Sequence, residues 1–229
     1  MMAQRIPAAW VAEVTREAED GPGGEGRSTH RPEVTPQRIE PSRSGLARLW
    51  DRWLHPLRRW RAGRRVRDLP AGARVLFVCQ GNLCRSPYAA MAFRARLAAR
   101  GGTGIEVESI GLVGRDRRSP DRIVAVARER GVDLAGHTSR LIDAPTVSAA
   151  DLVVVMEPEQ RRTMLRRFRK SRVIVLVDLD PSPVEVRRIP DPMKRSAGVT
   201  RSIFAQIDRC VTRLAEQVAG RSDGSEGGT

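Results

Sequence analysis

The sequence predicts an α/β protein built on a four-stranded parallel sheet that is flanked by helices. The first observation behind this prediction is the order of the elements, because short apolar runs that suit buried strands alternate with segments of helical periodicity. In that order the strands run parallel and their crossover connections are right-handed. The second observation is composition: 40% of the 229 residues are hydrophobic, which is enough for one core of ordinary size.

Residues 1–45 are expected to be mostly disordered and to precede the folded part as an N-terminal extension. The stretch 20–45 is rich in Gly, Pro, Ser, Arg and Glu. Its few apolar side chains cannot offset the entropy that ordering would cost. Residues 220–229 have a similar composition and are expected to form a disordered tail. The folded domain is therefore expected over residues 71–219.

Residues 46–67 have the pattern of a basic amphipathic helix. Leu and Trp recur every three or four residues and form one apolar stripe, which consists of Leu46, Trp50, Trp53, Leu54, Leu57 and Trp60. Nine Arg and one acid lie between Arg43 and Arg67. Pro56 is expected to break or kink the helix, at a cost of roughly 3 kcal/mol. Such a helix suits an anionic membrane surface, and the alternative is that the stripe packs on the main domain or on a partner chain.

Within residues 71–219 the four predicted strands are apolar or alternating runs. They lie at residues 74–79, 105–110, 151–156 and 172–177. Helical periodicity, a capping residue at Ser119 and a stop signal at Gly131 place helices between and after these strands. The predicted helices cover residues 86–100, 119–131, 158–168 and 197–218.

Charge and cysteine content narrow the class of protein. The formal net charge is +14. Lys170 and Lys194 are the only lysines, and every other basic residue counted in this charge is Arg. A basic chain favours anionic partners, but the Trp residues cluster on one segment instead of alternating with cations along a groove, so nucleic-acid binding is not expected. No apolar run approaches the ~18 residues of a membrane span, and no secretory signal is expected. Three cysteines are too few for a disulfide scaffold, so a cytoplasmic protein is expected.

One motif carries chemistry: Cys79 ends the first strand, and Arg85 and Ser86 follow where the next helix begins. The loop between them points backbone N–H groups inward and the helix dipole adds partial positive charge, which together suit a phosphate dianion. Arg85 adds a planar fork for two phosphate oxygens. The same field stabilises a thiolate at Cys79 and makes it nucleophilic at neutral pH. Ser86 can donate a hydrogen bond to that sulfur, Gly81 permits unusual backbone angles and Asn82 can brace the loop.

A second component of the chemistry is a candidate acid. Asp191 lies between two prolines in the run Ile189-Pro-Asp-Pro-Met193, so its loop is stiff and its carboxyl can be held over a pocket. It can protonate the leaving oxygen of a phosphate ester. The alternative is that Asp191 serves turn formation only, as an Asp beside Pro usually does.

These segments resemble the low-molecular-weight protein tyrosine phosphatases. The similarity begins at Arg74-Val-Leu-Phe-Val-Cys-Gln-Gly-Asn-Leu-Cys-Arg-Ser-Pro87, which holds the Cys-x5-Arg P-loop of that family. It covers about residues 73 to 219 and continues, in the family's order, through Ser109 and Gly111, Gly131 to Arg140, Asp151 to Glu157, and Ile189 to Pro192. The Met-Glu pair and the Ile-Pro-Asp-Pro loop are most similar to the bacterial branch tied to exopolysaccharide tyrosine kinases.

The resemblance implies a Rossmann-like three-layer fold and a protein-tyrosine phosphatase that hydrolyses phosphotyrosine through a phosphocysteine, with no cofactor and no metal. It implies that Cys79 is the nucleophile, that Arg85 binds phosphate, and that Asp191 is general acid and then general base. Ser109 and His137 are implied to brace the phosphate-binding loop. The other residues of that loop are Gln80, Gly81, Asn82, Leu83, Cys84 and Ser86.

Further implications concern regulation and partners. Cys84 matches a second loop cysteine that can form a reversible disulfide with Cys79 and protect it from over-oxidation. The implied partner is a phosphotyrosine-containing protein, and the bacterial branch suggests a tyrosine kinase of polysaccharide export. Residues 46–67 are expected to bring the enzyme to that kinase or to an anionic membrane, so a peripheral place at the inner membrane surface is predicted.

The sequence departs from the family where an aromatic residue usually follows Asp-Pro, because Met193 stands there, and this concerns substrate preference more than chemistry. Protein arginine phosphatases also resemble the loop, but they carry Thr where this chain has Leu83. Thioredoxin-coupled arsenate reductases need further cysteines, and residues 87–209 contain none. The non-enzymatic alternative is a phosphate-binding scaffold or membrane-docking protein. The presence of the nucleophile, the Arg and the acid together argues against it.

Overall fold

The computed structural model describes three stretches of the chain, at residues 45–101, 104–168 and 172–220. The segments predicted to be disordered, 1–45 and 220–229, lie outside the described residues except for their innermost residues. Of these, Gly45 begins a helix and Gly220 caps the end of another. Among the described helices, none combines the length and the apolarity that crossing a bilayer requires.

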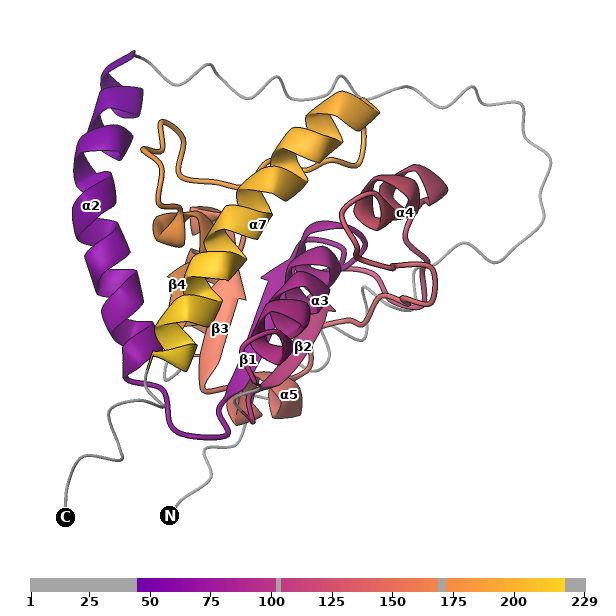
Figure 1. Ribbon diagram of the computed structural model, residues 1–229, viewed down its shortest axis with the longest axis horizontal. Helices are drawn as coiled ribbons and strands as arrows, with labels where there is room; N and C mark the ends of the chain where they lie inside the picture. The colour runs from indigo at the N-terminus through magenta and orange to yellow at the C-terminus, as the bar shows by residue number, and fades with distance from the viewer. Residues whose placement is uncertain (1–44, 102–103, 169–171, 221–229) are drawn as a thin grey trace. The chain divides into compact units, whose positions relative to one another are not determined.

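The centre of the described fold is a parallel sheet of four strands in the order β2-β1-β3-β4 (Figure 1). The strands are β1 (Arg74–Cys79), β2 (Glu106–Gly111), β3 (Leu152–Val155) and β4 (Val173–Val175). β1 and β3 occupy the middle of the sheet and are buried on both faces, which is why their sequences are continuous apolar runs. The predicted four-stranded parallel sheet is confirmed.

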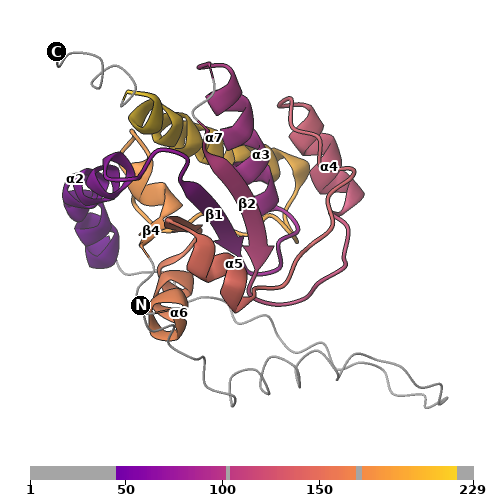
Figure 2. The ribbon, with the colours of Figure 1, turned by 90° about the horizontal axis from the view of Figure 1, so that it is seen from below.

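Helices cover both faces of the sheet (Figure 2). α3 (Arg85–Ala98) and α7 (Ala197–Ala219) lie together on one face, and α6 (Pro158–Arg167) lies on the other against β3 and β4. α4 (Asp121–Arg128) packs against α7. The contact between α3 and α7 includes the stacked rings of Tyr88 and Phe204, whose centroids are 3.8 Å apart. This packing fixes α3, and therefore fixes the loop that leads into it.

The helices and strands predicted from the sequence are present, with differences at their ends. Two short elements were not predicted: α5 (Ala144–Ala149), which Asp143 caps by accepting from the Thr146 N–H at 2.8 Å, and the 3-10 helix η1 (Leu176–Leu179). η1 also explains why β4 ends at Val175, two residues earlier than expected. The capping residue predicted for α4 does not cap it, since Ser119 bonds elsewhere and Pro120 precedes the helix.

α2 (Gly45–Arg67) is one continuous helix through Pro56, so the predicted break is wrong. The buried face of α2 is held on both sides of this proline, by Asp51 and His55 before it and by Val66 after it. Pro56 itself is exposed. The carbonyl of Arg52, which loses its intrahelical partner, lies on an exposed residue and can bind water instead.

The orientation of α2 contradicts one of the two alternatives for residues 46–67, namely that the apolar stripe packs on the main domain. The helix packs beside α7 and η1, but the Leu and Trp stripe does not take part in this packing. All six stripe residues are exposed, so the expectation that the stripe packs on the main domain is wrong. The face that packs contains Asp51, His55, Ala62, Gly63 and Val66.

Candidate active site

The phosphate-binding loop joins the central strand to the helix that covers it. Cys79 is the last residue of β1, residues 80–84 form the loop, and α3 begins at Arg85. The loop therefore lies at the carboxyl edge of the parallel sheet, where ligands bind in such folds. The first N–H groups of α3 have no partner inside the helix and face this edge with the positive end of its dipole.

The Cys79 sulfur receives two hydrogen bonds. The backbone N–H of Asn82 donates to Sγ at 3.3 Å, and the hydroxyl of Ser86 donates to the same atom at 3.1 Å. All three residues are buried. Both donors are placed to stabilise negative charge that develops on the sulfur during a reaction. The geometry therefore supports a nucleophile at Cys79.

Asn82 holds the loop in its strained shape. Its φ of 51° lies in the left-handed region, which Asn adopts more readily than most residues other than Gly. The side-chain NH₂ donates to the hydroxyls of Ser86 and Ser109, each at 2.9 Å. The side-chain oxygen accepts from the Arg140 N–H at 2.9 Å. The Asn82 side chain is therefore hydrogen-bonded to three segments: α3, β2 and the stretch that follows α4.

His137 contacts the same loop from the segment that follows α4. Its Nε2 lies 2.7 Å from the Asn82 carbonyl, and because a carbonyl only accepts, Nε2 must carry the proton. Burial lowers the pKa of His137 below its ordinary value, while this hydrogen bond raises it to a lesser degree. The structure thus brings Ser109 and His137, the two residues expected to brace the loop, into contact with its centre.

Arg85 is buried and donates to three acceptors. One guanidinium nitrogen donates to the Glu157 carboxylate and to the Ile189 carbonyl at 3.0 Å, and the other donates to Asp191 Oδ2 at 3.1 Å. Burial by itself lowers the pKa of Arg85, but the negative charges of Cys79, Asp191 and Glu157 raise it overall. The guanidinium therefore remains charged, and it links the loop to the acid.

The acid lies on a loop that two other elements hold. The Asp191 side chain is 47% exposed, and its Oδ1 accepts from the Met193 N–H at 3.1 Å. Arg122, on α4, donates to the carbonyls of Pro192 at 3.1 Å and Met193 at 2.8 Å. Met193 Sδ also lies 3.3 Å from the Cys84 thiol. These contacts place the acid loop over the phosphate-binding loop.

The three cysteines are all free and buried. Burial, followed by the negative charges of Asp191 and Cys79, raises the pKa of the Cys84 thiol to about 12. Burial also raises the pKa of Cys210, which lies in α7 away from the loop. Cys84 and Cys210 are therefore neutral thiols at neutral pH and do not compete with Cys79 as nucleophiles.

The sequence did not indicate a role in this site for four residues that shape it. Glu157 pairs with Arg85, Arg122 holds the acid loop, and the Ser119 hydroxyl donates to the Leu83 carbonyl at 2.7 Å. Gly111 must lack a side chain, because a Cβ there would lie 2.9 Å from the backbone of Gly81 and Asn82. Glu157 and Gly111 fall in the segments that resemble the family, but their roles depend on partners distant in sequence.

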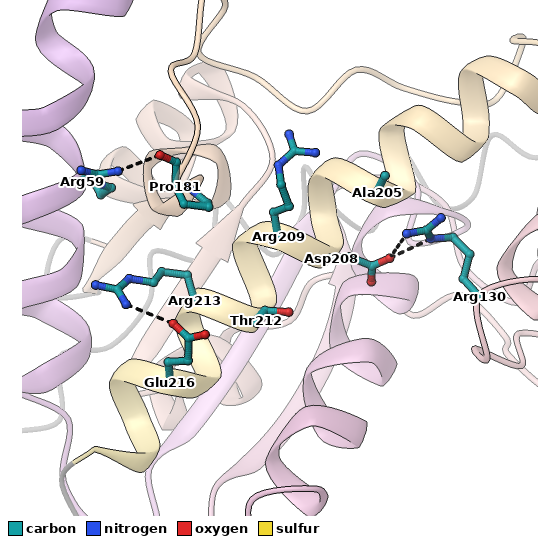
Figure 3. Close-up of a pocket in the computed structure, with 9 residues that line it drawn as sticks. All are labelled: Arg59, Arg130, Pro181, Ala205, Asp208, Arg209, Thr212, Arg213 and Glu216. Carbon is teal, nitrogen blue, oxygen red and sulfur yellow. Dashed lines mark hydrogen bonds and ion pairs between the residues drawn. The ribbon is translucent and has the colours of Figure 1, made fainter.

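A pocket of about 660 Å³ lies elsewhere, along α7 and next to α2 (Figure 3). It contains none of the residues predicted for the site. Its arginines already have acceptors: Arg130 pairs with Asp208, Arg213 pairs with Glu216, and Arg59 donates to the Pro181 carbonyl. Within the described residues, no group of His, Cys, Asp and Glu side chains could hold a metal ion.

One edge of the sheet thus combines the buried Cys79 sulfur, a charged guanidinium and a half-exposed carboxyl. The family model for the low molecular weight phosphotyrosine protein phosphatases matches residues 74–223, and this range contains every one of these groups. The chain belongs to this family. A low molecular weight phosphatase is a hydrolase of phosphate monoesters, and the site contains the groups that such hydrolysis uses.

Curated relatives of this phosphatase include two bacterial enzymes. The low molecular weight protein-tyrosine-phosphatase Etp of Escherichia coli K12 is 30% identical over 146 residues, which are 63% of this chain and 94% of Etp. A low molecular weight protein-tyrosine-phosphatase of Streptomyces coelicolor is 32% identical over 161 residues, which are 65% of this chain and 98% of the relative.

Solved structures share the phosphatase fold. The tyrosine phosphatase Wzb of Escherichia coli K30, in complex with sulphate, has a TM-score of 0.56 and 24% identity over 62% of this chain and 96% of its own. The YwlE arginine phosphatase of Geobacillus stearothermophilus has a TM-score of 0.59 and 24% identity over 69% of this chain and 99% of its own. At these identities the likeness concerns the fold alone.

Proposed function

We propose that this phosphatase hydrolyses phosphotyrosine in proteins through a phosphocysteine intermediate. The observation that carries the proposal is the Cys79 sulfur, which accepts hydrogen bonds from Asn82 N and Ser86 Oγ at the end of the central strand. The catalytic part is proposed to be residues 71–219, with residues 46–67 as an appended basic helix.

In the first step the Cys79 thiolate attacks phosphorus and the bond from phosphorus to the tyrosine oxygen breaks. Asp191 gives its proton to the departing oxygen, so a neutral tyrosine leaves. Arg85 and the N–H groups of the loop bind the remaining phosphate oxygens and stabilise the charge of the transition state. The product is a phosphocysteine and an ionised Asp191.

In the second step water attacks the phosphocysteine. Asp191 now takes a proton from the water, the phosphorus–sulfur bond breaks, and the thiolate of Cys79 returns with inorganic phosphate as the product. Ser86 supports both steps, because its hydroxyl donates to the sulfur when the sulfur is negative. Charges and protons balance without a metal ion.

The proposed substrate is a tyrosine kinase of polysaccharide export. The support is the similarity to the bacterial branch of the family, to which relatives such as Wzb and Etp correspond. We place the enzyme in the cytoplasm near the inner membrane surface, because a kinase of export would be found there.

The second candidate substrate is phosphoarginine, since YwlE arginine phosphatases are among the structural neighbours. Leu83 is the residue that speaks against it, because the arginine-specific loop that this one resembles has Thr at that position. Met193, which replaces the usual aromatic residue, is the feature that weakens preference for an aryl group. A direct comparison of the two substrates is therefore needed.

The test is steady-state hydrolysis of a tyrosine phosphopeptide and of phosphoarginine by reduced protein in EDTA. We expect cleavage of the phosphopeptide and its loss in Cys79→Ser. Preferential cleavage of phosphoarginine would transfer the assignment to an arginine phosphatase. If folded protein cleaves neither, the scaffold alternative takes its place.

A further inference from the structure

The outer face of α2 consists of large apolar side chains that the described fold leaves in solvent. The members of this outer face are Leu46, Leu49, Trp50, Trp53, Leu54, Leu57 and Trp60. Trp53 is 78% exposed, Trp50 65% and Trp60 55%. Figures 1 and 2 both place α2 at the edge of the described fold, beyond β4 and beside α7. Exposed apolar patches of this kind mark interaction surfaces.

The first half of the inner face of α2 is polar, whereas a surface helix usually buries apolar side chains along its whole length. Asp51 is 6% exposed and His55 is 4% exposed. The His55 Nε2 lies 2.9 Å from the Asp180 carbonyl, and Asp51 pairs with Arg58 at 2.7 Å and accepts from the Arg187 N–H at 3.3 Å. Burial of two polar side chains is tolerated because both are hydrogen-bonded to the domain.

Further contacts prevent α2 from turning its outer face inward. Arg59 donates to the Pro181 carbonyl at 2.9 Å. A Cβ on Gly63 would lie 2.7 Å from Gln217 of α7, so the two helices approach closely at this point. Val66 is fully buried. Rotation by half a turn would break these contacts and remove Asp51 and His55 from their partners, so the outer face stays outside.

The charge on α2 is strongly positive. The helix contains six exposed arginines, at Arg48, Arg52, Arg61, Arg64, Arg65 and Arg67. Its one acid, Asp51, is buried against the domain. Arg61 and Arg64 extend the row of the outer face, since they follow Leu57 and Trp60 by four residues each. The exposed surface of α2 is therefore apolar along most of its length and cationic at its C-terminal end.

We propose that the outer face of α2 docks on the surface of an anionic lipid bilayer. Trp50, Trp53 and Trp60 enter the boundary between headgroups and acyl chains, where an apolar ring with a polar N–H is favoured. Arg61 and Arg64 bind lipid phosphates beside them. The helix lies on the membrane and does not cross it. The rest of the domain remains in water, held in one orientation by the contacts of the inner face.

Charge complementarity decides in favour of lipid over a second copy of the chain. The outer face offers no acidic side chain, so a second copy that docks through the same face would supply no counter-charge for Arg61 and Arg64. A bilayer that contains phosphatidylglycerol supplies both negative phosphates and apolar depth. A straight row of Leu and Trp along four turns of helix also suits a flat boundary between water and lipid.

The experiment is co-sedimentation of the full chain with vesicles of phosphatidylcholine, with and without phosphatidylglycerol. A blue shift of Trp emission, measured in a Trp10→Phe background, reports entry of the outer face. We expect binding to the anionic vesicles, weakening as salt rises. The variant Trp50→Ala/Trp53→Ala/Trp60→Ala should lose at least about tenfold in affinity.

Two matched controls test whether position on α2 is decisive. Arg61→Ala/Arg64→Ala should weaken binding, whereas Arg166→Ala/Arg167→Ala, which removes two exposed charges from α6, should weaken it much less. Every variant should hydrolyse a small aryl phosphate at the rate of the unaltered chain, which shows that it is folded. Equal binding by the Trp variant, equal effects of the two Arg pairs, or a dimer in solution that the Trp variant dissolves would overturn the proposal.

Discussion

Arg85 donates to three acceptors of the protein itself. Its guanidinium donates to Glu157, to the Ile189 carbonyl and to Asp191. A phosphate dianion in the loop would supply new acceptors, so Arg85 must share its N–H groups between substrate and acid. The ion pair with Asp191 therefore serves to bring the acid toward the loop, and the incoming phosphate competes for the same cation.

The first prediction concerns the acid itself. Asp191→Asn keeps the shape of the side chain but removes the carboxyl proton that would be given to the leaving oxygen. Turnover of substrates with poor leaving groups should therefore fall by ~100-fold or more. Aryl phosphates whose leaving group is already a stable anion should be much less affected. Turnover measured over a series of leaving groups checks this, and a uniform loss across the series would mean that Asp191 acts only in the fold.

The second prediction concerns oxidation. Peroxide oxidises the Cys79 thiolate to a sulfenic acid and is itself reduced, releasing hydroxide. The Cys84 thiol then condenses with the sulfenic acid to form a disulfide and one water. Oxidation of Cys79 also removes one of the charges that raise the pKa of Cys84. After peroxide and then thiol treatment, the unaltered enzyme should recover most of its activity and Cys84→Ser little of it. Equal recovery would show that Cys84 gives no protection.

The third prediction concerns pH. Burial lowers the pKa of His137 below its ordinary 6.5, so the unfolded chain binds a proton that the folded chain does not. Stability is therefore lost as the pH falls through about 6.5, and the loss levels off below the folded pKa. His137→Gln keeps a side-chain N–H for the Asn82 carbonyl but does not titrate. Thermal melting at about pH 8 and about pH 5.5 should show a smaller change for the variant, and identical changes would contradict this reasoning.

At the scale of elements, α4 acts on the acid loop. Arg122 donates to the carbonyls of Pro192 and Met193 and to the hydroxyl of Thr200, so it joins the loop to α4 and to the start of α7. Asp191 precedes these carbonyls directly. Its position therefore depends on a helix that contributes no reacting group.

The fourth prediction tests this dependence. Arg122→Ala should lower kcat for a poor leaving group on the order of tenfold, the equivalent of a lost charge-assisted hydrogen bond. Inhibition by inorganic phosphate should not change, because the phosphate-binding loop is untouched. The matched control is Arg128→Ala on the same helix, where the arginine is exposed and pairs only weakly with Asp133. Equal effects of the two variants would assign Arg122 a general structural role.

Most elements could be predicted from the sequence, because their patterns are local. Continuous apolar runs identify β1 and β3, and helical periodicity identifies α3, α6 and α7. η1 and α5 are too short to leave a periodic signal, and their ends depend on single contacts such as the Asp143 cap. The phosphate loop is recognisable because its residues are contiguous. The parts played by Glu157 and Arg122 are not, since each depends on a partner about seventy residues away along the chain.

The alternative that the Leu and Trp stripe of α2 packs on the main domain is wrong. An amphipathic pattern predicts that the apolar side packs inward. That rule failed because Asp51 and His55 find their partners in the segment 178–187, which nothing near them in the sequence indicates. Tertiary hydrogen bonds thus override a local pattern.

At the scale of the whole molecule, the contacts of its inner face make α2 part of the same folded unit as the phosphatase domain. Two variants that shorten aliphatic side chains of α2 can test this. Val66→Ala removes fully buried atoms and should cost about 2 kcal/mol, lowering Tm by roughly 4 to 8 °C. Leu57→Ala removes atoms from the outer face and should change Tm by less than about 1 °C. Thermal denaturation of the two variants checks this fifth prediction, and equal shifts would mean that α2 is not held in the described orientation.

The contacts of α2 also set an order of events during synthesis. Among the described elements α2 leaves the ribosome first, but η1 and α7, which receive its inner face, follow more than 100 residues later. At about 5 to 20 residues per second, translation leaves α2 without these partners for roughly 5 to 30 seconds. In that interval the nascent helix carries its tryptophans with no domain attached. In the docking proposed above, the anchor therefore emerges before the enzyme has folded, and delivery to the membrane precedes activity.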